Sequence, residues 1–78
     1  SRPGPVIEKL KLYNESLVTE ELTKLTNILN ADTPNDGASL IPLFNVANKH
    51  LDNLTTLERR LNFLERMVKN NEESNNNK

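Results

Sequence analysis

His50 is the only histidine in the chain and the first residue to consider for metal or catalytic chemistry. A metal site would need further ligands at helical spacing, and Asp52 and Glu58 do not make a convincing set with it. Nucleophilic catalysis would need a concave pocket, and the long amphipathic segments described below predict no such pocket. We therefore interpret His50 as a structural or solvent-facing side chain.

Paired carboxylates and glycine-rich loops are two further carriers of chemistry, and both are poorly represented. Glu20 and Glu21, like Glu72 and Glu73, are adjacent in the sequence, so the two members of each pair do not face each other on a helix. The chain has two glycines and no cysteine, which excludes a glycine-rich phosphate loop and thiolate metal sites. The sequence therefore predicts a protein that is not an enzyme and that has no metal or cofactor.

A row of basic side chains in the second half of the chain is the remaining candidate for binding chemistry. Its members are possible contacts to an acidic partner: Arg59, Arg60, Arg66 and Lys69. Basic residues also suit a solvated helix face near the C-terminal end of the helix dipole. The net charge of −1 provides no overall field that would attract nucleic acid, and no aromatic platform accompanies the row. A helical nucleic-acid-binding domain that uses this row is the alternative hypothesis, and nucleic acid is the less favoured partner.

The composition limits the chain to one small domain. Its 78 residues contain thirteen leucines and no tryptophan, so the core must be aliphatic. No apolar run approaches the roughly 20 residues that span a bilayer. The N-terminus lacks the apolar segment of a signal peptide, and the absence of cysteine fits a reducing compartment. We expect an intracellular protein, cytoplasmic or nuclear, without a membrane span.

Hydrophobic periodicity predicts an all-α fold, an antiparallel hairpin of two long helices. Apolar residues recur at spacings of three and four over residues 6–30 and again over residues 39–70. In the first helix the main stripe begins with Val6, Leu10, Tyr13 and Leu17, and Ile7, Leu12 and Val18 lie off it. Between them, residues 31–38 (ADTPNDGA) combine proline, glycine and aspartate in a turn-forming segment. Residues 1–5 are predicted to be a disordered lead-in, and residues 71–78, which lack apolar side chains, a disordered polar tail.

Two details of the helical pattern remain open. The register slips by one residue between Leu17 and Val18, which favours one drifting helix but also allows a break near Asn14, with three helices closing as a monomer. In the second helix the apolar residues form one stripe: Leu40, Phe44, Ala47, Leu51, Leu54, Leu57, Leu61, Leu64 and Val68. Its step of three residues taken twice, from Leu51 to Leu57, predicts a local overwinding of a coiled coil.

The helices carry more apolar surface than one contact between them can bury. The second helix is expected to be about 48 Å long and the first about 37 Å, which leaves roughly two turns of the second helix uncovered. This expected overhang contains Phe63, Leu64, Met67 and Val68. A hydrophobic helix end without a cover from its own chain is typical of an interface.

These features predict a non-enzymatic protein–protein interaction module, either an assembly or adaptor domain or a small scaffold subunit of a larger complex. The hairpin would be completed as a helical bundle or coiled coil, by oligomerisation with itself or by another helical protein chain. The predicted partner-binding residues are Leu54, Leu57, Leu61, Phe63, Leu64, Met67 and Val68.

Overall fold

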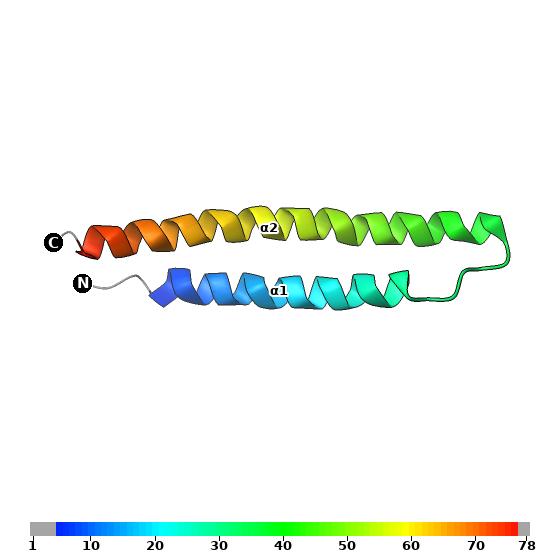
Figure 1. Ribbon diagram of the computed structural model, residues 1–78, viewed down its shortest axis with the longest axis horizontal. Helices are drawn as coiled ribbons and strands as arrows, with labels where there is room; N and C mark the ends of the chain where they lie inside the picture. The colour runs from blue at the N-terminus through cyan, green and yellow to red at the C-terminus, as the bar shows by residue number, and fades with distance from the viewer. Residues whose placement is uncertain (1–4, 77–78) are drawn as a thin grey trace.

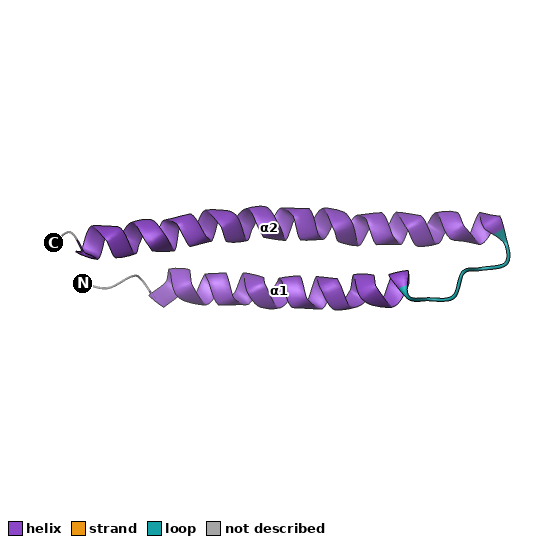
Figure 2. Cartoon of the chain, in the orientation of Figure 1, coloured by secondary structure: helices purple, strands orange, loops and turns teal. Residues whose placement is uncertain are grey.

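Two helices that lie side by side in opposite directions make up most of the molecule (Figures 1 and 2). The computed structural model describes residues 5–76, with the side chains of residues 6–73. Helix α1 spans Pro5–Leu29, a short 3₁₀ helix η1 spans Gly37–Ser39, and helix α2 spans Leu40–Asn76. The hairpin is a rod of 64 × 14 × 14 Å. The predicted all-α helical hairpin is confirmed.

Helix α1 is continuous, so the alternative with a break near Asn14 is wrong. Pro5 is the first residue of α1, where the missing N–H of proline has no helical partner to lose. Asn14 stays helical and is only 3% exposed. Its Nδ2 donates to the carbonyl oxygen of Leu10, 2.9 Å away. This bond to the preceding turn provides the amide with a partner without a helix end.

The connection between the helices is built on Asp36. Its carboxylate accepts a hydrogen bond from the backbone N–H of Ala38 at 3.0 Å, and its carbonyl accepts one from the N–H of Ser39, also at 3.0 Å. Asp36 therefore caps η1, which leads directly into α2 at Leu40. Helix α2 thus begins one residue after the start at Ser39 that the sequence predicts.

Helix α2 continues to Asn76, beyond the predicted end at residue 70. After Pro42 the helix contains no proline or glycine, so nothing in the polar segment 71–76 forces it to end. The polar tail predicted for residues 71–78 is thus helical as far as Asn76. Residues 77–78, like residues 1–4 of the predicted lead-in, lie outside the described residues.

The core of the hairpin is a single row of side chains on each helix, which we call the hairpin seam. Every member is buried or half-buried, and the spacing alternates without interruption between three and four residues, as in a coiled coil. The seam consists of Ile7, Lys11, Asn14, Val18, Glu21, Leu25 and Ile28 in α1 and of Leu40, Leu43, Ala47, His50, Leu54, Leu57, Leu61, Leu64 and Val68 in α2.

The seam of α2 differs from the predicted apolar stripe at two positions. Phe44 and Leu51 are 53% and 46% exposed, and their places are taken by Leu43 and His50. With His50 included, the alternating spacing has no overwound step, so the predicted local overwinding is wrong. The predicted stripe contains Leu51 instead of His50 because a pattern of apolar residues includes a leucine and omits the histidine next to it.

The expected overhang is also placed differently. Leu64 is 8% exposed, and Val68 shares a depression between the helices with Lys11 and Leu12. Both residues therefore lie against α1. Because the chain crosses beyond the end of α1 before α2 begins, part of the excess length of α2 lies at the loop end (Figure 1). The expectation that Leu64 and Val68 lie on an uncovered end is wrong.

Candidate interaction surface

One side of the hairpin carries a broad apolar surface, which we call face A. Leu17 of α1 and Arg60 of α2 line the same depression between the helices, so the two residues lie on the same side of the hairpin. Helical spacing places Val6, Leu10 and Tyr13 on the same side of α1 as Leu17. It likewise places Phe63 and Met67 on the same side of α2 as Arg60. Face A consists of Val6, Leu10, Tyr13, Leu17, Phe63 and Met67.

Face A remains open to solvent after the hairpin has formed. The exposed fractions are 78% for Val6, 61% for Tyr13 and 57% for Phe63. Leu10 and Met67 are 45% and 39% exposed. The surface lies near the free end of the hairpin, by which we mean the end opposite the loop. Such a cluster of large apolar side chains is typical of an interaction site.

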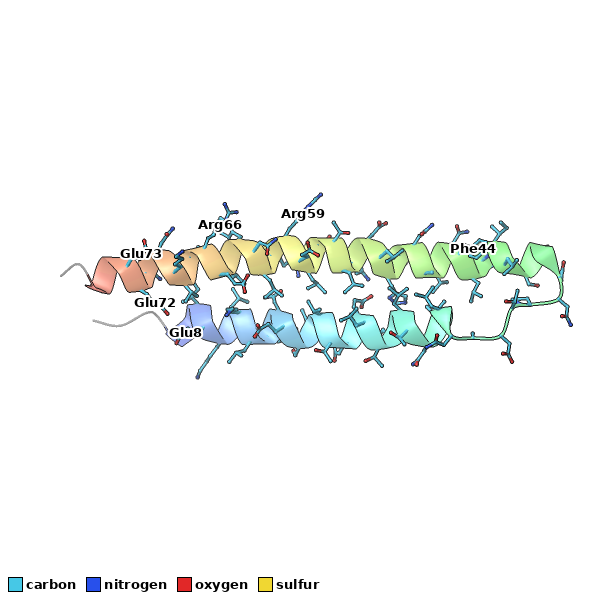
Figure 3. The ribbon with its side chains drawn as sticks, in the orientation of Figure 1. Glu8, Phe44, Arg59, Arg66, Glu72 and Glu73 are labelled. Carbon is cyan, nitrogen blue, oxygen red and sulfur yellow. The ribbon has the colours of Figure 1, made fainter. Side chains whose placement is uncertain are left out.

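The other side of the hairpin, face B, has an apolar half near the loop and a mostly acidic half near the free end, where Leu12 is also exposed, at 64%. Near the loop end it carries Leu22, Leu29, Ile41, Phe44 and Leu51, of which Leu29 is the most exposed at 66%. Toward the free end, positions at seven-residue intervals from these leucines and from Phe44 are occupied by glutamates: Glu8, Glu15, Glu58, Glu65 and Glu72. Glu8 and Glu72 line one depression at the free end and appear together there in Figure 3.

The predicted partner-binding residues fall into two groups in the structure. Leu57 and Leu64 are buried in the hairpin seam, and Leu54, Leu61 and Val68 are half-buried there. Phe63 and Met67 belong to face A and are accessible to a partner. Whether any of the seven contacts a partner stays a prediction.

The main stripe predicted for the first helix begins with three residues that are exposed in the structure, Val6, Leu10 and Tyr13. In contrast, Ile7 and Val18, predicted to lie beside this stripe, are half-buried in the hairpin seam. Val6, Leu10, Tyr13 and Leu17 follow one another at spacings of four, three and four residues, the same alternation as in the hairpin seam. Two such rows on one helix are typical of a helix with two neighbours, and the spacing is the same in both rows, so it does not distinguish the row that packs on α2 from the row that stays exposed.

The four basic residues proposed as contacts to an acidic partner are all exposed. Arg59 and Arg66 extend from α2 on the side away from α1, in one row with Glu73 (Figure 3). Arg60 borders face A. A row that includes a carboxylate suits a solvated helix face, and the nucleic-acid alternative gains no observation in its favour.

A polar cluster crosses the hairpin seam. Oε1 of Glu21 accepts hydrogen bonds from Nδ1 of His50 and, at 3.1 Å, from Nδ2 of Asn53. The side chains of His50 and Glu21 are 19% and 13% exposed. His50, interpreted from the sequence as structural or solvent-facing, is a structural contact between α1 and α2. These bonds favour the ionised carboxylate and lower the pKa of Glu21 below its ordinary value of 4.5.

The lowered pKa of Glu21 predicts a pH dependence of stability. A carboxyl group with a lower pKa in the folded state stabilises the fold above its ordinary pKa, and this stabilisation is lost as the pH falls through the lowered value. We expect the melting temperature to fall as the pH drops below the ordinary value of 4.5, and to fall less in Glu21→Gln. Thermal unfolding followed by circular dichroism measures this. Glu20→Gln, which removes an exposed neighbouring carboxylate, should keep the dependence of the wild type, and equal pH profiles for Glu21→Gln and the wild type would contradict the role of the cluster.

No protein-family model matches the chain, and the curated proteins and the solved structures contain no match to it either. Over the described residues, neither helix holds a stretch long and apolar enough to cross a membrane. In the same part of the chain, no group of three or more histidine, aspartate or glutamate side chains gathers as a metal site would require.

Proposed function

We propose that the chain is a protein–protein interaction module, an assembly or adaptor domain that acts by docking its hairpin against further helices. The observation that carries the proposal is the apolar surface left over after α1 and α2 have packed. Within the described residues, twelve large hydrophobic side chains remain at least 39% exposed.

The arrangement of these side chains supports docking rather than scattered exposure. Four apolar residues of α1 repeat at coiled-coil spacing on face A, outside the hairpin seam. A helix with two such rows is typical of a bundle in which each helix has two neighbours. Burying a large apolar side chain contributes roughly 1.5–3 kcal/mol, so covering face A would add substantially to a stability of about 4–12 kcal/mol for this length.

Phe63 and Met67 provide the test of the proposal. We expect the double variant Phe63→Asp with Met67→Asp to keep its helical content, because both side chains lie outside the hairpin seam. The same variant should lose at least about 30-fold in affinity for a docking partner, whether a second copy or another helical chain. Circular dichroism measures the first quantity. Quantitative affinity capture, with the tagged chain as bait, measures the second.

The matched control is Asn62→Asp, which introduces the same aspartate at an exposed polar position next to Phe63. A genuine partner is one that the wild type and Asn62→Asp retain equally and that the double variant loses. If no interaction distinguishes these three chains, face A is an exposed bystander and the proposed function is wrong.

A further inference from the structure

The apolar row of α1 on face A is symmetric in its spacing. Val6, Leu10, Tyr13 and Leu17 are separated by four, three and four residues, which is the same sequence of steps in both directions. A second α1 laid antiparallel on this row therefore places Val6 opposite Leu17 and Leu10 opposite Tyr13, without an unmatched position. This is the self-complementarity that a two-fold interface requires.

The two-fold axis that pairs the α1 rows also pairs the α2 residues of face A with those of the second copy. The centre of the α1 row lies between Lys11 and Leu12. At the depressions that line the seam, Leu17 lies beside Arg60, and Leu12 lies beside Val68. The centre of the row is therefore level with the part of α2 between Arg60 and Val68, which contains Phe63 and Met67. An axis at this level brings Phe63 of one copy against Met67 of the other, and a thioether packs well against an aromatic ring.

The charges around face A are compatible with this pairing. The axis that joins Phe63 and Met67 also places Arg60 of one copy near Asn70 of the other, so no like charges meet there. On face B the equivalent axis, through Phe44 and Leu51, would bring Glu58 of one copy beside the turn at Asp36 of the other. Two carboxylates would then lie together, which opposes association. The charges thus favour face A over face B as the surface for a second copy.

The area of face A is close to what a dimer needs. The exposed parts of its six side chains amount to on the order of 600 Å² per copy. A standard interface buries about 800 Å² on each partner, and polar residues at the border such as Arg60 and Asn70 supply the remainder. Interfaces at the low end of the size range are typical of weak, reversible association, so we expect a dimer that forms and dissociates with protein concentration.

We infer that face A binds a second copy of the chain, antiparallel and about a two-fold axis, to form a four-helix bundle. The inference rests on the proposed function and names its partner. In this bundle α1 packs on α1 of the second copy and α2 on α2, while face B stays outside with its acidic half exposed.

Sedimentation equilibrium of the chain over about 1–500 µM tests the association. We expect a concentration-dependent dimer for the wild type. Tyr13→Glu, at an exposed position of face A, should weaken the dimer at least about 30-fold, because each dimer buries two of the introduced carboxylates. Phe44→Glu, the matched substitution of an exposed aromatic residue on face B, should leave the dimer unchanged.

Because the chain contains no cysteine, disulfide crosslinking can test the geometry. An equimolar mixture of Leu10→Cys and Tyr13→Cys chains should form the mixed disulfide in preference to either symmetric one, since position 10 of one copy faces position 13 of the other. A mixture of Val6→Cys and Leu17→Cys should behave in the same way. Preferred crosslinks between position 10 of one copy and position 63 of the other would show that α1 packs on α2 of the second copy, with both free ends at the same end of the bundle. This result would overturn the inference.

Two other results would also overturn it. A chain that stays monomeric at every concentration excludes the second copy, and the proposed function is then decided separately by the capture experiment with the Phe63 and Met67 variants. A dimer that Phe44→Glu dissociates and Tyr13→Glu does not would place the association on face B.

Discussion

Replacing Leu57 by alanine is expected to lower the free energy of unfolding by about 2–5 kcal/mol, a large part of the roughly 4–12 kcal/mol available to a chain of this length. Leu57 is 6% exposed and lies in the hairpin seam. Its truncation removes buried methyl groups and leaves a cavity that two rigid helices close only in part. Urea unfolding followed by circular dichroism, at one fixed protein concentration, measures the loss.

Leu51→Ala is the matched control, since it is the same substitution in the same helix, six residues earlier in the sequence. Leu51 is 46% exposed, so its truncation should change the free energy of unfolding by less than about 1 kcal/mol. The apolar stripe predicted from the sequence places Leu51 and Leu57 in one row and implies similar losses. Equal losses would therefore support that stripe and contradict the seam through His50.

Replacing Asn14 by leucine is expected to raise the free energy of unfolding by about 1–3 kcal/mol. Asn14 is 3% exposed, and it occupies a seam position that a leucine would fill with apolar atoms. Its amide nitrogen donates to Leu10 in its own helix, and over residues 6–73 no hydrogen bond joins Asn14 to α2. A local bond of this kind offsets part of the cost of burying an amide but does not hold the two helices together.

Thermal and urea unfolding of Asn14→Leu test this expectation, with Asn62→Leu as the control on an exposed part of α2. Asn62→Leu should leave the stability of the hairpin nearly unchanged, because its side chain gains little burial. A less stable Asn14→Leu chain would show that the amide makes a contact across the seam that outweighs the leucine, such as one through a bound water.

Asn14 and Glu21 are polar residues of the seam that could fix the register of α1 against α2. A polar residue at a core position of a coiled coil lowers stability and can restrict the helices to one register. The side chain of Asn14 donates to Leu10 in its own helix, whereas Glu21 reaches His50 and Asn53 across the seam. We therefore assign the role of fixing the register to Glu21 rather than to Asn14, and the connection of only ten residues between Leu29 and Leu40 limits the register as well.

The sequence by itself determined the helices and the turn between them. Spacings of three and four residues describe the local geometry of a helix, and proline with Asp36–Gly37 interrupts it, so neither feature depends on distant contacts. The excess of apolar surface was also readable, because it follows from counting the side chains against one helix–helix contact. Phe63 and Met67 were identified correctly as residues with an exposed side chain in the hairpin.

The tertiary structure decided which apolar residues are buried and which are not. Each helix offers several rows of side chains, and the row that becomes the seam is selected by the best fit of α1 against α2. That fit includes a polar contact of Glu21 with His50 that no hydrophobic pattern reveals. The choice of row left Tyr13 exposed, and the level of the two helices relative to each other placed Leu64 against α1. A periodic sequence allows several registers of α1 along α2, and only the packing of the two helices distinguishes them.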